Sequence, residues 1–167
     1  MKFRELPKFI AEGTYRVNIG WNYIEEWIER ENKLNLNLDP DFQRAHVWTE
    51  AQQQAYVEFV LKGGRGSGEL KFNCAGWMID FRGPFVLVDG KQRLEAVRKF
   101  LRNELTIFEN YKYSDFEDRL PVYAEFIVMV NDLADYDDVL RWYLQLNSGG
   151  TPHTEDELEK VRQLLEN

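Results

Sequence analysis

The sequence has 167 residues, the length of one ordinary domain, and its hydrophobic fraction of 44% and aromatic fraction of 14% can form a core, which excludes a disordered chain. The formal net charge of −8 disfavours a broad nonspecific contact with nucleic-acid phosphates, although a local basic patch is compatible with it. The single cysteine, Cys74, excludes an internal disulfide and a cysteine-based zinc site.

The first half of the chain alternates strand and helix signals. Helical spacing of apolar residues and two capping-box patterns, Asn22 with Glu25 and Thr49 with Gln52, indicate two helices. Gly63-Gly64 ends the second helix, whose apolar stripe is Tyr56, Phe59 and Val60. The elements predicted here are a strand over 15–19, a helix over 22–32, a strand over 34–38 and a helix that starts after Thr49.

The second half reads as several strands followed by helices. Arg82-Gly83 is predicted to turn between two of the strands, and Asn147 to Gly150 to end a helix that opens near Asp135. The predicted elements are strands over 72–74, 77–81, 85–88 and 122–130, and helices over 91–103, 135–147 and from 154 onward. Because strands and helices interleave irregularly, we expect an α+β fold with a small mixed sheet flanked by helices.

The chain shows no internal repeat, no linker, no signal-peptide pattern at its start and no apolar run near the roughly 18 residues of a membrane span. We therefore expect residues 1–167 to form a single domain without a separate nuclease domain. We also expect a cytoplasmic protein with no membrane partner.

The most informative segment is the apolar run Phe85–Val88, which continues into Asp89-Gly90 and then directly into a helix. The unbroken apolar run predicts an interior strand. Unpaired amides and the positive dipole end mark the opening of a helix, and a glycine lets an anion approach them. Lys91 adds a charge and Arg93 a two-pronged donor, while Asp89 is suited to a metal ion or a ribose hydroxyl. The alternative is a tight strand-to-helix turn with solvated charges.

Two further segments are candidates for ligand contacts. In the first, Gln43 and Arg44 stand beside Phe42 and Trp48, an arrangement that can hold a base or a phosphate. Its alternative is that the aromatic residues fill the core while Arg44 pairs with Asp41. In the second, residues 143–154 offer Asn147, Ser148 and Thr151 as donors in a glycine-rich loop, and the alternative is a simple helix end.

Taken in order, these segments resemble the DUF262 family, the amino-terminal domain of GmrSD-type modification-dependent restriction systems, which is related to the ParB/sulfiredoxin fold. The resemblance rests on Phe42-Gln43-Arg44 with Trp48, on Val88 to Arg93, and on Leu146 to Pro152, and it covers residues from about 34 to 158. It implies a nucleoside-triphosphate-binding domain of ParB/sulfiredoxin-like fold that hydrolyses its nucleotide or uses it as a switch, acting in DNA restriction or in conflict between bacteria and phages.

The resemblance also implies roles for individual residues. Those expected in catalysis are Asp89, Arg93, Gln43 and Arg44, and those expected to hold Mg²⁺ are Asp89 and Asp41. Those expected to bind the nucleotide are Gly90, Lys91, Gln92, Asn147, Ser148, Gly149 and Gly150.

Two departures from the family pattern are Lys91, where glutamine is usual, and His153, where an apolar residue is usual. With only His46 and His153 present, the chain lacks a complete His-Asn-His metal nuclease, so we expect at most weak or partner-dependent nuclease activity. The rival hypothesis is a non-enzymatic module that binds DNA or a nuclease subunit, such as a defence component or a phage-encoded decoy.

Overall fold

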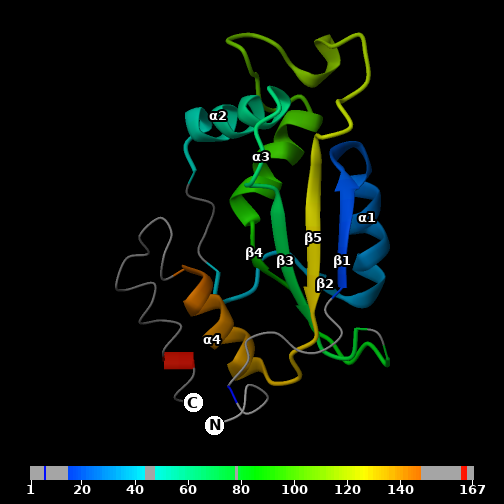
Figure 1. Cartoon of the computed structure of the whole chain (residues 1–167), viewed down its shortest axis with the longest axis vertical. Coiled ribbons are helices and arrows are strands. Elements are labelled where there is room, and N and C mark those ends of the chain that lie inside the picture. Colours follow the sequence, from blue (N-terminus) through cyan, green and yellow to red (C-terminus); the bar gives the residue numbers. More distant parts are fainter. Residues whose placement is uncertain (1–5, 7–14, 44–47, 78, 148–162, 165–167) are drawn as a thin grey trace.

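The structure is a computed structural model that describes residues 6, 15–43, 48–77, 79–147 and 163–164 (Figure 1). Its α-helices are α1 (Ile24–Glu31), α2 (Glu50–Leu61), α3 (Lys91–Leu101) and α4 (Tyr136–Asn147), and its 3₁₀ turns are η2 (Trp21–Tyr23), η3 (Asn32–Leu34) and η4 (Tyr113–Asp115). Its strands are β1 (Tyr15–Gly20), β2 (Leu36–Asn37), β3 (Glu69–Cys74), β4 (Phe85–Asp89) and β5 (Glu125–Asn131).

The five strands form one mixed sheet in the order β1-β5-β3-β4-β2. Strand β5 runs antiparallel to β1 and parallel to β3, while β4 runs antiparallel to β3 and parallel to the short β2. Because β4 lies between two neighbours and Phe85 to Val88 are all buried, the prediction of an interior strand buried on both faces is confirmed. The sheet with its flanking helices is the expected α+β fold.

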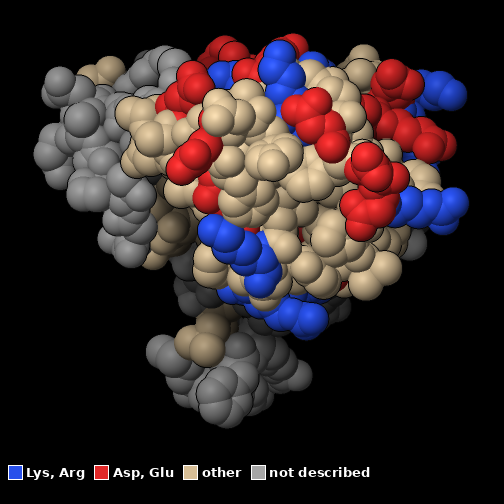
Figure 2. Space-filling model, turned by 90° about the horizontal axis from the view of Figure 1, so that it is seen from above, with Lys and Arg blue, Asp and Glu red and all other residues tan. Residues whose placement is uncertain are grey.

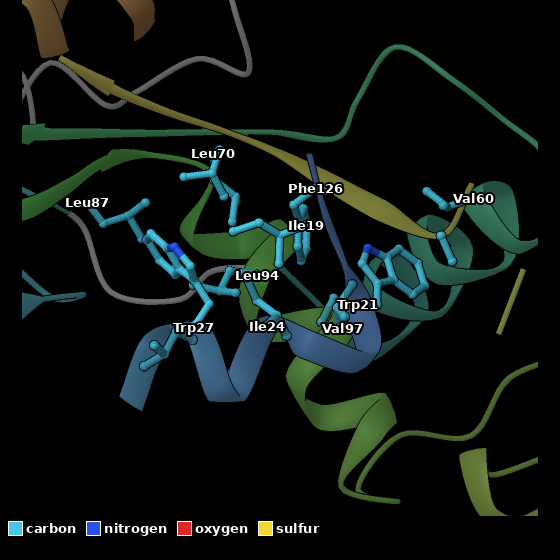
Figure 3. Close-up of a cluster of buried hydrophobic side chains, with 14 of the residues drawn as sticks. Ile19, Trp21, Ile24, Trp27, Val60, Leu70, Leu87, Leu94, Val97 and Phe126 are labelled. Atoms are coloured by element: carbon cyan, nitrogen blue, oxygen red, sulfur yellow. The ribbon is translucent and has the colours of Figure 1, made fainter. Parts of the chain in front are cut away.

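Helices α1, α2 and α3 pack on one face of the sheet and enclose the main core. Successive side chains of a strand point to opposite faces, so β3 and β5 each present every second residue to this core. Figure 3 shows Leu70 of β3 and Phe126 of β5 lying among side chains from the three helices. Trp27 of α1, Val60 of α2 and Leu94 of α3 are among the helical side chains of this cluster.

The opposite face of the sheet is divided between an apolar part and a polar part. Over β4, Val86 and Val88 pack against Leu140 and Tyr143 of α4. Toward β1 the same face carries ion pairs and hydrogen bonds, such as Arg16 to Glu69 at 3.1 Å and Asn18 to Glu125 at 2.8 Å. Helix α4 therefore covers the β4 side of this face.

Local signals predicted several element boundaries correctly. Thr49 accepts a hydrogen bond from the Gln52 amide while the Gln52 side chain accepts one from the Thr49 amide, which confirms that capping box. The helix predicted to follow Gly90 is α3, and the helix predicted near Asp135 is α4.

Other predicted elements are wrong. The strand predicted over 77–81 is not formed by its described residues, because the amides of Ile79, Asp80 and Phe81 all donate to the Gly76 carbonyl in a turn. The alternation at Val122 is not part of β5, since Val122 is 93% exposed and a turn at Pro121 precedes the strand. The strand expected over 34–38 reduces to η3 and the two-residue β2.

Two side-chain assignments also need correction. Asn22 and Glu25 do not form a capping box, because α1 continues from η2 and its N-cap, Tyr23, makes no side-chain bond. Glu25 instead binds Arg98 of α3. Phe59 is 49% exposed, and Val57 is buried in the α2 stripe in its place.

The helix predicted from Thr154 lies outside the described residues, apart from Gln163 and Leu164, which are helical. Within the described part of the chain, no helix combines the length and apolar character needed to cross a membrane.

Candidate functional site

The segment that joins β4 to α3 has the strand-to-helix geometry predicted from its sequence. β4 ends at Asp89, Gly90 takes a left-handed conformation with φ 106°, and α3 begins at Lys91. Intrahelical bonding starts with the Leu94 amide donating to the Gly90 carbonyl at 2.9 Å. The amides of the turn before Leu94 have no acceptor within the helix, so this helix end is chemically suited to an anion.

Gly90 has a structural role that does not depend on a ligand. A Cβ added at Gly90 would lie 2.6 Å from the Leu70 side chain and 3.0 Å from the Glu69 carbonyl oxygen. The missing side chain thus lets the opening of α3 pack against β3, and the positive φ independently favours glycine. The role predicted from the sequence, in which the glycine lets an anion approach the amides, is therefore not needed to explain why residue 90 is glycine.

Four charged side chains gather beside the turn, and we call Glu69, Lys71, Asp89 and Arg93 the opening cluster. Arg93 Nη2 donates to Asp89 Oδ2 and to the Glu69 carbonyl, both at 2.9 Å. Lys71 Nζ lies 3.4 Å from Asp89 Oδ2 and 3.1 Å from Glu69 Oε2. The cluster therefore ties the end of β4 and the start of α3 to β3.

One hydrogen-bond donor of Arg93 has no partner among the described residues. Its Nε atom is buried and bonds no described residue. The guanidinium also lies near Tyr56 of α2: burial raises the pKa of the Tyr56 phenol to about 12, and the charge of Arg93 opposes that rise. Arg93 thus combines a structural ion pair with a buried donor that has no acceptor in the described residues.

The Gln43 segment lies directly beside the turn. Gln43 Nε2 donates to the Leu87 carbonyl of β4 at 2.6 Å, and the Trp48 amide donates to Gln92 Oε1 of α3 at 3.0 Å. The two ends of this loop are thus bonded to the two sides of the strand-to-helix turn. Arg44 and His46 belong to its middle and lie outside the described residues.

The predicted segment over 143–154 is connected to the strand-to-helix turn through α4. The rings of Phe42 and Tyr143 pack at a tilt with centroids 5.0 Å apart, on the face of β4 that carries Val88. Asn147, the last residue of α4, donates from its side chain to the Tyr143 carbonyl at 2.8 Å. The remaining predicted ligand-binding residues of this segment, Ser148, Gly149 and Gly150, lie outside the described residues, as does His153.

Lys91 borders a hollow on the helical side of the sheet. Its ammonium group pairs with Asp39, which follows β2. The hollow has a volume of about 370 Å³, with an apolar floor of Leu38, Leu87 and Leu94. That volume is in the range of pockets that hold small molecules, which is about 300–1,000 Å³.

The two carboxylates predicted to hold Mg²⁺ lie in different surroundings. Asp89 is paired with Lys71 and Arg93, whereas Asp41 is exposed. Partial burial and then the charge of Asp41 raise the pKa of Tyr136, which places Asp41 near the start of α4. No group of three or more metal-binding side chains occurs in the described residues.

Sequence reasoning missed Glu69 and Lys71, because it began the β3 strand at Phe72. Extending the alternation backward was the available signal: Leu70 and Phe72 face the core, so Glu69 and Lys71 fall on the opposite face. That Lys71 then meets Asp89 depends on a register irregularity between Lys71 and Phe72, which no pattern in the sequence announces.

Comparison with known proteins identifies the family. No curated protein shows significant similarity to this chain. The family model of the GmrSD restriction endonuclease N-terminal domain matches residues 24–163, which include all three segments described above. The match confirms the resemblance derived from those segments and associates the chain with restriction and phage defence. The chain belongs to the family of GmrSD restriction endonuclease N-terminal domains.

Proposed function

We propose that this chain binds a nucleoside triphosphate at the opening of α3, with the phosphates held by the first-turn amides, Lys91 and Arg93. The observation that carries the proposal is the pair of hydrogen bonds from Gln43 to Leu87 and from Trp48 to Gln92. They bring a donor-rich loop to both sides of a helix end that is chemically suited to anions. A tight turn needed only for folding requires no such loop.

The charges at the site support an anion that arrives with its own metal ion. Lys91 and Arg93 are each paired with a carboxylate, so a triphosphate would compete with Asp39 and Asp89 for them. A Mg²⁺ ion bound to the triphosphate offsets that competition by giving Asp89 a new cation. Mg²⁺ is commonly held by one or two protein carboxylates together with substrate phosphates, and Asp89 is the best-placed carboxylate for this role.

The nucleoside is proposed to occupy the hollow beside Lys91. Its leucine floor suits the apolar faces of a base and a ribose, and its opening adjoins the first residue of α3. In this arrangement the phosphates lie over the helix end while the nucleoside lies between α3 and β2.

Hydrolysis is proposed to follow from positioning and charge stabilisation. Gln43 is fixed beside β4 and is suited to orient a water molecule, while Arg93 and Arg44 would stabilise charge on the transferred phosphoryl group. Asn147, Ser148, Gly149 and Gly150 would complete the phosphate contacts. Loss of the terminal phosphate would release these groups, which is how such a site can act as a switch for a nuclease subunit.

A DNA partner is the weaker proposal for this chain. The net charge is −8, and on the face seen in Figure 2 acidic and basic side chains are interspersed around an uncharged centre. Duplex DNA is usually bound by a continuous basic surface, because affinity comes largely from phosphate neutralisation. A protein partner such as a nuclease subunit therefore fits the charge distribution better.

The proposal is tested by titrating the purified chain with each of the four ribonucleoside triphosphates, with and without Mg²⁺. Calorimetry and thermal unfolding report binding, and release of inorganic phosphate reports hydrolysis. A ligand present at 100 times its Kd stabilises the folded state by about 2.7 kcal/mol. A folded chain that binds none of the four nucleotides under either condition would overturn the proposal in favour of a non-enzymatic module.

A matched pair of lysine variants localises the site. Lys91→Ala removes the ammonium group at the start of α3, and Lys99→Ala makes the same change near the end of the same helix. We expect Lys91→Ala to weaken triphosphate binding about tenfold and Lys99→Ala to leave it unchanged. Equal effects of the two substitutions would mean that the nucleotide binds elsewhere.

A further inference from the structure

The free edge of the sheet carries a groove that the nucleotide proposal does not use. It has a volume of about 360 Å³ and runs between β1 and one face of the first helical segment. Its helical wall consists of Tyr23, Glu26, Trp27 and Arg30, a spacing that places all four on the same side. The opposite wall is β1 itself, an edge strand of the sheet.

The backbone of β1 presents unused pairing groups to this groove. The Trp21 amide donates to the Ala124 carbonyl at 2.9 Å, so at this position the chain faces β5. Backbone groups of a strand point alternately to its two sides, which directs those of Arg16, Asn18 and Gly20 outward. Asn18 and Gly20 also line the groove, and no strand of the described residues pairs with this edge.

A row of outward amides and carbonyls defines the geometry of its occupant. Only an extended chain can pair with Arg16, Asn18 and Gly20 in succession, as in binding by strand addition. Such a chain would lie between β1 and the helix and direct alternate side chains toward Trp27 and the 60% exposed ring of Tyr23. The groove therefore suits an extended peptide whose every second side chain faces the helical wall, with apolar residues against the two aromatic rings.

The charge of the groove distinguishes between possible occupants. Arg30 is bonded to Glu31 at 2.9 Å, whereas Glu26 pairs with no cation among the described residues. The wall thus presents an uncompensated carboxylate. A second copy of this chain, with its own net charge of −8, would meet electrostatic repulsion, while a basic segment would be attracted.

We propose that the β1 edge binds an extended basic segment of a partner protein, which adds a strand to the sheet and sets a lysine or arginine against Glu26. This inference is independent of the nucleotide site, because the groove lies at the opposite edge of the sheet from β2 and contains none of the residues assigned to the nucleotide.

The experiment uses an acetylated and amidated heptapeptide with valine at its second and sixth positions, lysine at its fourth and serine elsewhere, so that the valines and the lysine face the same wall of the groove. Two control peptides have either glutamate in place of lysine or N-methyl groups on alternate amides. We expect the lysine peptide to bind, and each control to bind at least about tenfold more weakly. We also expect amide hydrogen exchange to be fast at Asn18 and Gly20 in the free protein and to slow when the peptide is added.

Two matched pairs of variants test the groove in the whole chain. Glu26→Lys should weaken binding of the lysine peptide about tenfold and favour the glutamate peptide, whereas Glu29→Lys, outside the groove wall, should change neither. Asn18→Pro and Asn18→Ala both lose the side-chain bond to Glu125, but only proline removes the outward amide. Binding should fall further with proline than with alanine.

Several results would overturn the proposal. They are slow exchange at Asn18 and Gly20 in the protein alone, equal binding of the lysine and glutamate peptides, and unchanged binding by a folded Glu26→Lys variant. A dimer in sedimentation experiments that Asn18→Pro dissociates and Asn18→Ala does not would assign the edge to a second copy instead. Loss of nucleotide binding would leave the proposal unaffected, so the two sites are tested separately.

Discussion

Helix α3 carries two arginine–carboxylate clusters, and they differ in what the arginines leave unsatisfied. The flank cluster consists of Glu25, Glu95, Arg98 and Arg102 and joins α3 to α1. All three guanidinium nitrogens of Arg98 bond carboxylate oxygens, two of them on Glu25. In the opening cluster, Arg93 makes both of its bonds through Nη2, and its buried Nε bonds no described residue.

This difference shows why paired charges do not by themselves mark a functional site. The flank cluster is a closed set of ion pairs whose evident role is to hold two helices together. The opening cluster stands beside the amides of a helix end and next to Gln92, which a loop from elsewhere in the chain contacts. The helix-end amides, rather than the paired charges, separate a candidate anion site from a structural contact.

The largest effect is expected from Gly90→Ala, which tests whether the opening depends on its contact with β3. The new Cβ would contact Leu70 and the Glu69 carbonyl, and the φ of 106° strains any non-glycine residue. We expect a loss of about 2–4 kcal/mol in the free energy of unfolding, measured by urea denaturation.

Gly66→Ala is the matched control for that measurement. Gly66 has a similar φ of 98°, but nothing lies within 4 Å of an added Cβ. Its loss should reflect backbone strain alone, about 1 kcal/mol. If the two variants were equally destabilised, close packing of Gly90 on β3 would not be the reason for the glycine.

The next effect compares one arginine from each cluster. Arg93→Ala should weaken triphosphate binding about ten- to hundredfold, because a charged hydrogen bond contributes roughly 1.5–3 kcal/mol. It should also lower the stability by about 1–2 kcal/mol, since Asp89 and the Glu69 carbonyl lose a partner. Arg102→Ala in the flank cluster, which does not line the hollow proposed for the nucleoside, should cost at most about 1 kcal/mol of stability and leave nucleotide affinity unchanged.

Parallel calorimetric titrations and urea denaturation of both variants separate these effects. A similar loss of nucleotide affinity in both would show that the opening cluster has no special role. Unchanged affinity in Arg93→Ala would assign this residue to the fold alone.

The fold was largely predictable because its elements depend on local patterns. The Thr49 cap, the unbroken apolar run of β4 and the spacing of Leu94 and Val97 in α3 each reflect local backbone or burial requirements. The errors arose where tertiary contacts override the apolar pattern of the sequence. Trp77 is apolar because its ring packs on that of Phe85, with centroids 4.9 Å apart, although Trp77 lies in a turn. Val122 fits the alternation of apolar residues that continues through β5, but it is exposed and lies before the strand begins.

The strand-to-helix turn of the candidate site was predictable, but the pairing of its side chains was not. The sequence placed Asp89, Gly90 and Arg93 at one turn because they are contiguous. That Arg93 binds Asp89 and that Lys71 joins them depends on how β3 and β4 align, which residue types do not determine. The bond from Gln43 to Leu87 likewise spans 44 positions in the chain.

A smaller effect is expected when Asp89 is made neutral. Asp89→Asn keeps the size of the side chain but removes the carboxylate proposed to bind Mg²⁺, and it leaves Lys71 and Arg93 without their shared anion. We expect Mg²⁺-free triphosphate to bind somewhat more tightly and the gain in affinity from Mg²⁺ to fall about tenfold. Calorimetry at several Mg²⁺ concentrations measures both changes. If the Mg²⁺ dependence stayed the same, the metal would depend on other ligands.

The smallest effect is expected at the flank cluster and concerns pH. Partial burial by itself raises the pKa of the Glu25 carboxyl, but the hydrogen bond and charge of Arg98, with the charge of Arg102, outweigh burial and lower it below the ordinary 4.5. A carboxyl whose pKa is lowered by folding stabilises the protein above its unfolded pKa. That contribution is lost as the pH falls through the lowered folded value.

Glu25 is partly exposed, so solvent screening keeps this contribution modest. Glu25→Gln should therefore be slightly less stable than the unsubstituted chain at neutral pH, and the difference should shrink as the pH falls below 4.5, as measured by urea denaturation. Nucleotide affinity should not change at neutral pH, because Glu25 belongs to α1 and does not line the hollow proposed for the nucleoside. A stability difference that persists in acid would mean that Glu25 acts through packing instead of charge. A loss of nucleotide affinity in Glu25→Gln would show that the two clusters on α3 are coupled along the helix.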